Sequence, residues 1–113
     1  MEQTIVVKNI STYAMFDTDG VKLRKQILAA WAQGTTLVTL DFQGIELFAT
    51  MFFNASIGWL ILYKNPDYVS KHLQCINLSS LGKETYQHSY DNALMVKENP
   101  SYQKALAEFS EEE

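Results

Sequence analysis

Apolar residues recur along the first part of the chain with two spacings, one typical of strands and one typical of helices. Residues 4–8 (TIVVK) are rich in β-branched types and predict a first strand, with residues 13–16 as its candidate hairpin partner. From residue 17 to Gly34 the apolar positions follow helical spacing, and Asp17 can accept hydrogen bonds from the free amides of the first turn. The pattern therefore predicts a strand followed by a helix.

The middle of the chain contains two strongly apolar segments. Residues 36–42 (TLVTLDF) predict a strand covered on both faces, because apolar side chains occupy both alternating sets of positions. The uncharged segment 47–63 predicts a helix that is apolar on nearly every side, which is typical of a helix buried on more than one side. Asn65 and Pro66 end this helix, since proline lacks the amide hydrogen and favours extended backbone before it.

The second half of the chain adds a third strand and further helices. After a turn or short helix, residues 73–78 (LQCINL) predict a strand, and a polar helix follows from about Ser80 to Lys97. The inner side chains expected for that helix are Leu81, Tyr86, Tyr90, Leu94 and Met95. Asn99 and Pro100 predict the start of a last short helix. Its apolar residues Tyr102, Leu106 and Phe109 are expected to dock, while Glu111, Glu112 and Glu113 remain solvated.

The order of these elements predicts a single α/β domain over residues 1–113, with a short C-terminal helix and acidic tail at about 99–113. Alternating strands and helices favour a mixed, mainly parallel sheet of about four strands with helices packed on it. Apolar residues make up 47% of the 113 residues and charged ones 19%, which is enough apolar surface for one folded core. No repeat or flexible linker divides the chain.

Charge and cysteine content narrow the classes of partner. The formal net charge of −4 leaves little basic surface for nucleic acid, so DNA and RNA are excluded as expected partners. A single cysteine, Cys75, and an N-terminus without a signal-peptide pattern predict a cytoplasmic protein. The uncharged segment 47–63 contains polar and small residues and is interpreted as buried in protein, so no membrane contact is expected.

Candidate catalytic and metal-binding residues are sparse. His72 and Cys75 form one close pair, with His88 as a distant third ligand, whereas zinc sites need clustered ligands. The glycines stand singly, so neither common nucleotide-binding loop is present. Asp41, at the end of a predicted strand, could bind a cation or act as a base, but an Asp that accepts hydrogen bonds from loop amides is favoured. We therefore expect no cofactor, no metal and no enzymatic activity.

Three segments in order resemble the bacterial STAS-like domain of unknown function. They are TDGVKLRKQI (residues 18–27), LVTLDFQGIEL (37–47) and MFFNASIGWL (51–60). The family pairs a "DG..LR..I" helix with a "V.LDF.GV" strand, followed by an apolar loop and helix. INLS at residues 76–79 corresponds to the next strand of the family, so the resemblance covers about residues 17–80. It implies a STAS-like fold.

The chain also resembles, more distantly, the STAS domains of anti-sigma-factor antagonists. In those domains a serine at the start of the helix after the "LDF"-like strand is phosphorylated by a partner kinase. The resemblance implies a switchable docking surface and a histidine-kinase-type ATPase as a partner class. The Asp-Ser-Ser-Gly pattern of the antagonists is absent here. Thr50 is the nearest hydroxyl and Ser56 lies further along, but a helix N-cap and a small packing residue are the favoured interpretations of the two.

These observations predict a non-enzymatic regulatory or protein-interaction module of STAS-like type. The candidate partner-binding residues are Phe48, Thr50, Met51, Phe52, Phe53, Asn54 and Trp59. The expected partner is a kinase-like ATPase or a second copy of the chain. The alternative is a small-ligand or nucleotide-binding domain with a pocket at the strand carboxyl ends, near Asp41, Thr50 and Asn54.

Overall fold

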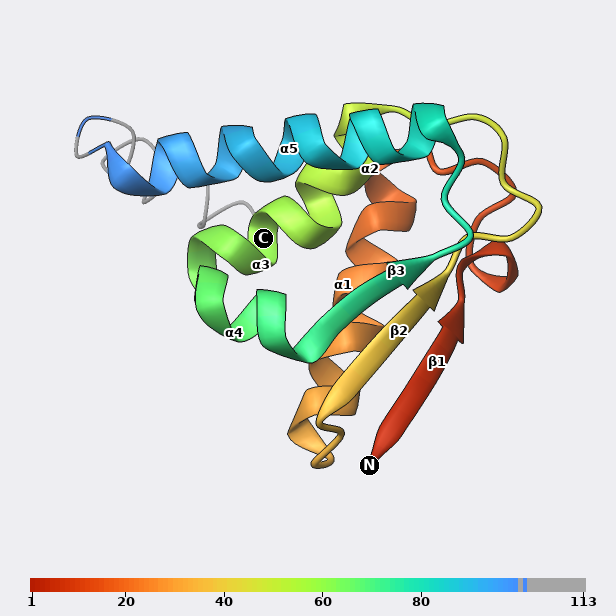
Figure 1. The fold of residues 1–113 in the computed structure, drawn as a ribbon, viewed down its shortest axis with the longest axis horizontal. Helices are drawn as coiled ribbons and strands as arrows, with labels where there is room; N and C mark the ends of the chain where they lie inside the picture. Colours follow the sequence, from red (N-terminus) through yellow and green to blue (C-terminus); the bar gives the residue numbers. More distant parts are fainter. Residues whose placement is uncertain (100, 102–113) are drawn as a thin grey trace.

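Three short strands form one parallel sheet, which is the base on which the helices pack (Figure 1). The structure is a computed structural model that describes residues 1–99 and residue 101. The strands are β1 (Glu2–Val6), β2 (Leu37–Asp41) and β3 (Leu73–Ile76), in the spatial order β1-β2-β3. The α/β class is confirmed, with three strands among the described residues instead of about four, all of them parallel.

The two predicted strands at 36–42 and 73–78 correspond to β2 and β3, but the first strand differs from its prediction. It begins two residues earlier than residue 4, and Val7–Asn9 form a 3-10 turn instead of continuing the strand. Because this turn redirects the chain, residues 13–16 do not form a hairpin with β1, and that prediction is wrong. Ala14 instead forms a single parallel bridge with Phe48.

The first long helix, α1 (Asp17–Ala32), follows the predicted spacing closely. Its buried apolar residues include Leu23, Ile27 and Trp31. The N-cap position belongs to Phe16, which has no side-chain cap, while the Asp17 carboxylate accepts a hydrogen bond from the Thr18 amide at 2.9 Å. Asp17 therefore satisfies one early amide from inside the first turn.

The uncharged segment forms one helical stretch in three consecutive parts: α2 (Thr50–Phe53), the π-helical turn η2 (Asn54–Gly58) and α3 (Trp59–Tyr63). Ala49 is the N-cap, with no side-chain cap, so the interpretation of Thr50 as the cap is wrong. The Thr50 side chain lies one position too far along the chain for that role. Its exposed hydroxyl is consequently not committed to capping the helix.

The remaining helices are α4 (Pro66–His72) and α5 (Ser80–Glu98). Helix α5 lies along α2 and α3, and near its end the Lys97 ammonium donates a hydrogen bond to the Leu62 carbonyl at 2.8 Å. Leu81 and Met95 are 49% and 51% exposed, so the prediction that both face inward is wrong. Gly82, next to Leu81, instead faces the Phe48 ring, and Ala93, two positions before Met95, is buried beside Gly58 of η2.

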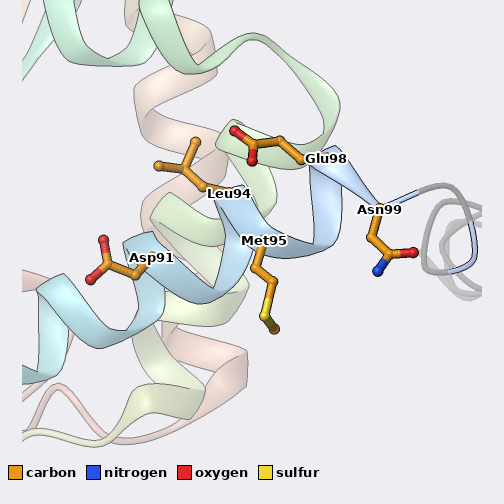
Figure 2. Close-up of a pocket in the computed structure, with 5 residues that line it drawn as sticks. All are labelled: Asp91, Leu94, Met95, Glu98 and Asn99. Carbon is orange, nitrogen blue, oxygen red and sulfur yellow. The ribbon is translucent and has the colours of Figure 1, made fainter.

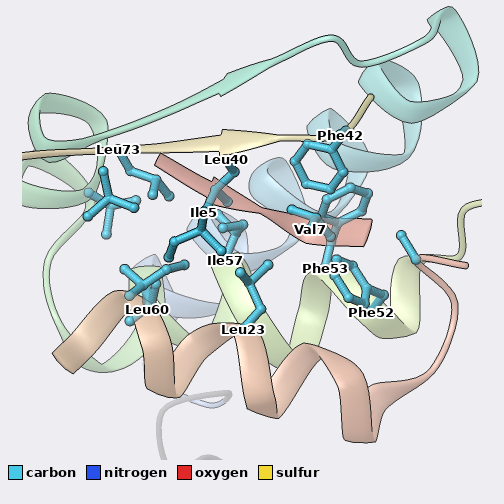
Figure 3. Close-up of a cluster of buried hydrophobic side chains, with 14 of the residues drawn as sticks. Ile5, Val7, Leu23, Leu40, Phe42, Phe52, Phe53, Ile57, Leu60 and Leu73 are labelled. Atoms are coloured by element: carbon cyan, nitrogen blue, oxygen red, sulfur yellow. The ribbon is translucent and has the colours of Figure 1, made fainter. Parts of the chain in front are cut away.

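The hydrophobic core lies between the sheet and the helices (Figure 3). Ile5, Leu40 and Leu73 extend from the three strands toward Leu23 of α1 and Ile57 of η2. The helices cover one face of the sheet, and the side chains of Val6 and Ile76 on the other face are exposed. Val6 belongs to β1 and Ile76 to β3, whereas the middle strand β2 has only buried and half-buried residues, as predicted. On the face away from the core Thr39 is buried, and its hydroxyl accepts a hydrogen bond from the Gln74 side-chain amide at 2.9 Å.

Helices α1 and α2 meet at a glycine. A Cβ atom placed on Gly20 would lie 2.4 Å from the Phe52 carbonyl oxygen and 2.9 Å from the Ala55 Cβ atom. The first of these neighbours is backbone and cannot move away as a flexible side chain can. Only glycine therefore permits this separation between the two helices.

We expect the substitution Gly20→Ala to lower the free energy of unfolding by about 1–3 kcal/mol, because the added methyl group forces the two helices apart. Urea denaturation measures this change. The control is Gln26→Ala, at an exposed position of the same helix, with an expected change within about 0.5 kcal/mol. Equal stability of the wild-type protein and the Gly20→Ala variant would contradict the close helix contact.

Candidate functional site

Four large apolar side chains are exposed on the segments that lead into α1 and α2 and on the first turn of α2. Tyr13, Phe16, Leu47 and Met51 are 46%, 54%, 49% and 54% exposed. They lie on two segments joined by backbone hydrogen bonds, from the Ala14 amide to the Leu47 carbonyl at 3.1 Å and from the Ala49 amide to the Ala14 carbonyl at 2.9 Å. We call these four residues the loop-end surface. The loops that carry it are fixed in place by the bridge between them.

Three members of the loop-end surface were not predicted from the sequence. Tyr13 and Phe16 fall in the segment that the sequence predicts as a hairpin strand, and Leu47 falls at the start of the segment predicted as a buried helix. Their exposure follows from the Ala14–Phe48 bridge, which joins residues far apart in the sequence. A single bridge leaves no periodic signal. The available signal is the presence of two aromatic residues, Tyr13 and Phe16, within the four residues before the start of α1.

Phe52 and Phe53 are fully buried, so they cannot contact a partner in this structure, contrary to the prediction. Phe53 packs against Phe42, Phe48 and Tyr86, with ring centroids 5.8, 6.1 and 5.4 Å away. Their burial follows from the position of α2, which lies between α1, the sheet and α5. Both residues support the core beneath the loop-end surface.

The other predicted partner-binding residues reach the surface to different extents. Thr50, Met51 and Asn54 are exposed, and Phe48 is half-buried with its ring beside Gly82 of α5. Trp59 is half-buried and lies further along, in α3. The structure thus places Thr50 next to Met51 of the loop-end surface and separates both from Trp59 by the length of η2.

Trp59 of α3 belongs to a second group of side chains, which includes Arg24 of α1, only 3% exposed. The Arg24 guanidinium lies over the Trp59 ring, 4.4 Å from its centroid, and the Tyr63 ring centroid is 4.8 Å from that of Trp59. The Trp59 Nε1 atom is buried and has no hydrogen-bond partner among the residues that the structure describes. A buried indole N–H normally finds an acceptor.

Of the two candidate phosphoacceptors, only Thr50 is accessible. Ser56 is fully buried in η2, and its hydroxyl donates a hydrogen bond to the Phe52 carbonyl at 2.9 Å. A kinase could reach Ser56 only if the helix opened. Thr50 is exposed at the first position of α2.

Asp41 lies at the carboxyl end of β2, where it organises the strand exits. Its Oδ1 atom accepts hydrogen bonds from the Asn77 side chain at 2.9 Å and from the Gln43 amide at 3.0 Å. These bonds, that from Asn77 first, lower the pKa of the Asp41 carboxyl below its usual value. The interpretation of Asp41 as an acceptor for loop amides is confirmed. Asn77 itself adopts a left-handed conformation, with φ of 60°.

His72 and Cys75 do not converge on a common point. The His72 ring stacks on Tyr68, and its Nδ1 atom lies 3.0 Å from the Tyr68 carbonyl oxygen. Burial raises the pKa of the Cys75 thiol to about 12, and the thiol therefore remains protonated and unreactive at neutral pH. Among residues 1–99 and 101, no three His, Cys, Asp or Glu side chains gather as metal ligands would.

One surface pocket of about 510 Å³ is lined by residues of α5 and its C-cap (Figure 2). The lining residues are Asp91, Leu94, Met95, Glu98 and Asn99. Because they all come from one helix end, polar groups from different elements do not converge on a ligand there. This pocket is also remote in sequence from Asp41, Thr50 and Asn54, where the alternative interpretation placed a ligand.

Within the described part of the chain, no helix combines the length and the apolar character needed to cross a membrane. Helix α5 is the longest, and it carries charged residues along its length. The apolar stretch of α2, η2 and α3 packs against α1 and α5.

We expect the substitution Asn77→Gly to raise the pKa of Asp41 toward its ordinary value, because glycine keeps the left-handed conformation but removes the side-chain amide. An NMR titration of the Asp41 carboxyl measures the change. Since the folded-state pKa is lowered, the stabilisation from these bonds is present at neutral pH. It is lost as the pH falls through that lowered pKa. An unchanged Asp41 titration in Asn77→Gly would show that the Asn77 amide is not the cause.

The sequence and the fold agree with one domain family. The sequence profile of a STAS-like domain of unknown function matches residues 19–83, which is more than half of the chain. No curated protein and no solved structure matches the sequence. The matched segment includes most of α1, then β2, the helices α2 to α4, β3 and the start of α5. The chain therefore belongs to the family of STAS-like domains of unknown function.

Proposed function

We propose that this STAS-like domain is a non-enzymatic regulatory module that binds a protein partner through the loop-end surface and the start of α2. The observation that carries the proposal is the exposure of Tyr13, Phe16, Leu47 and Met51 on two mutually bonded loops. Large apolar side chains gathered on rigid loops are typical of interaction sites. Thr50 and Asn54 supply polar groups at the margin.

The distant resemblance to anti-sigma-factor antagonists supports a histidine-kinase-type ATPase as the partner. A second copy of the chain is the other candidate. Both would use apolar anchors such as Met51 and Phe16, surrounded by polar side chains. We propose that the domain acts in the cytoplasm, where its single cysteine remains reduced.

We further propose Thr50 as the hydroxyl that a partner kinase would modify. Its side chain is exposed beside Met51, so a phosphate there would add about two negative charges next to an apolar contact. Such charge opposes docking of an apolar partner surface, because the phosphate would have to lose its bound water. Phosphorylation at Thr50 would therefore release the partner.

Partner binding is tested by the substitution Met51→Asp, with Met95→Asp as its matched control. Both methionines are about half exposed, but Met95 lies at the far end of α5. We expect Met51→Asp to weaken binding of a captured partner at least about tenfold, because a buried anchor is typically worth more than about 1.4 kcal/mol. Affinity capture from native extract, followed by titration with the identified partner, measures this loss.

In the same experiment, Met95→Asp is expected to bind as the wild-type protein does. Sedimentation of the purified wild-type chain and of the same two variants measures self-association. A monodisperse monomer that captures no protein would remove the support for the proposal. Equal loss in both variants would place the contact elsewhere.

Phosphorylation is tested by the intact mass of the chain purified from its native cells. We expect a fraction of the wild-type chain to carry the mass of one phosphate group. Thr50→Val should lose that fraction, and Ser56→Ala should keep it. Because the Thr50 side chain caps no helix, Thr50→Val should change stability by less than about 0.5 kcal/mol. A phosphate that persists in Thr50→Val would exclude this residue.

A further inference from the structure

Strand β1 lies at an open edge of the sheet. It is the outermost strand in the order β1-β2-β3, and beyond it Figure 1 shows no further strand or α-helix of the described residues. Ile5 is buried toward the core, whereas Glu2, Gln3, Thr4 and Val6 are exposed. An edge strand presents a row of unpaired backbone groups to any strand that approaches it.

The opposite edge of the sheet, on β3, is less accessible. Helix α4 packs against β3 and ends directly before it. At this edge Leu73 is 7% exposed and Cys75 is half-buried. Of the two edges, the one on β1 is therefore the better place for another strand to add to the sheet.

The backbone groups of alternate residues of β1 point to the open edge. The Met1 carbonyl accepts a hydrogen bond from the Thr36 amide at 2.8 Å, so the backbone of Met1 faces β2. Along a strand, successive residues direct their N–H and C=O groups to opposite sides. The groups of Glu2, Thr4 and Val6 therefore point away from β2, and no strand among the described residues pairs with them.

These outward groups are symmetrical about Thr4, the middle residue of the strand. In an antiparallel pair, hydrogen-bonded pairs recur at every second residue, and the two members of each pair exchange both bonds. A two-fold axis through Thr4 places Thr4 opposite Thr4 of a second copy, and Glu2 opposite Val6 at both ends. This register uses every outward-facing residue of β1. The edge is therefore complementary to itself.

The side chains are compatible with the same register. Threonine opposite threonine is a favourable cross-strand pair. Each Glu2 carboxylate lies beside Val6 of the other copy, and four residues of strand, about 14 Å, separate the two Glu2 positions. Because this distance exceeds the Debye length of about 8 Å at physiological ionic strength, repulsion between the two carboxylates is largely screened.

We propose that the chain forms a symmetric dimer by antiparallel pairing of β1 with β1 of a second copy, centred on Thr4. The sheets of the two copies then join into one sheet, with the helices of both copies on the same face. The loop-end surface lies on other segments of the chain. This dimer therefore does not rest on the proposed function.

Hydrogen exchange of the full chain, followed by NMR, tests the register. In the dimer the Thr4 and Val6 amides donate across the two-fold axis, so their exchange should slow at least about tenfold as the protein concentration rises through the dimer dissociation constant. The Gln3 and Ile5 amides bond to β2 in the monomer and in the dimer. Their exchange should change much less.

The substitution Thr4→Pro removes both central hydrogen bonds of the dimer, because proline has no N–H group. The N–H group that is lost points away from β2, a place where an edge strand tolerates proline. We expect the dimer dissociation constant, measured by sedimentation, to rise at least about tenfold. Thr4→Val, the matched control, keeps the N–H group and should sediment as the wild-type chain does.

Circular dichroism shows whether Thr4→Pro keeps its fold. If it does not, Thr4→Lys replaces it, because two like charges directly opposite each other oppose the pairing while the backbone groups remain. The weakening of the dimer in Thr4→Lys should then diminish with added salt.

A dimer that shows slowed exchange at Thr4 and Val6, and that Thr4→Pro or Thr4→Lys weakens, supports the proposal. A monomer at every concentration, or a dimer in which these amides exchange as in the monomer, overturns it. A dimer that Met51→Asp abolishes and Thr4→Pro keeps also overturns it. Capture of a different protein is measured separately, so the two proposals fail by different results.

Discussion

The Phe53 side chain packs against three separate parts of this domain, and the arrangement of the rest of the structure depends on this packing. Its ring contacts Phe42 at the end of β2, Phe48 in the following loop and Tyr86 of α5, all with centroids 5.4 to 6.1 Å apart. Such aromatic pairs add stability beyond the area they bury. Through this one side chain the sheet, the loop and α5 are held in a fixed relation. The exposed Leu47 directly precedes Phe48 in the chain, and the exposed Met51 directly follows Thr50.

Much of the fold was predictable because its signals are local. Apolar spacing placed α1, β2, β3 and α5 within a few residues of their observed bounds. The errors came from contacts between distant segments. The bridge between Ala14 and Phe48 replaced the expected hairpin, and Ala49 took the cap position expected for Thr50. Neither outcome depends on a residue preference that a single sequence reveals.

The candidate site was predictable only in part, because a pattern of apolar residues does not distinguish surface from core. In the segment 47–63, Phe52 and Phe53 are buried while Met51, immediately before them, is exposed. The direction of each side chain depends on where α1 and α5 lie against α2. Likewise, Leu81 is exposed because the neighbouring Gly82 takes the position next to the Phe48 ring. In both places the partner helix, rather than the residue type, decides which side chain reaches solvent.

The parallel order β1-β2-β3 has a consequence for how the chain folds. Glu2 pairs with Leu37 and Val38 pairs with Leu73, so each pairing joins residues that are 35 apart in the sequence. Each pairing closes a loop that contains α1 in the first case and α2 to α4 in the second, and this loop closure costs entropy before any contact compensates for it. Each strand pairs with the one before it in the sequence, so the spatial order of the strands is also the order in which they are synthesised. No pairing has to wait for a strand that lies later in the chain than the two strands it joins.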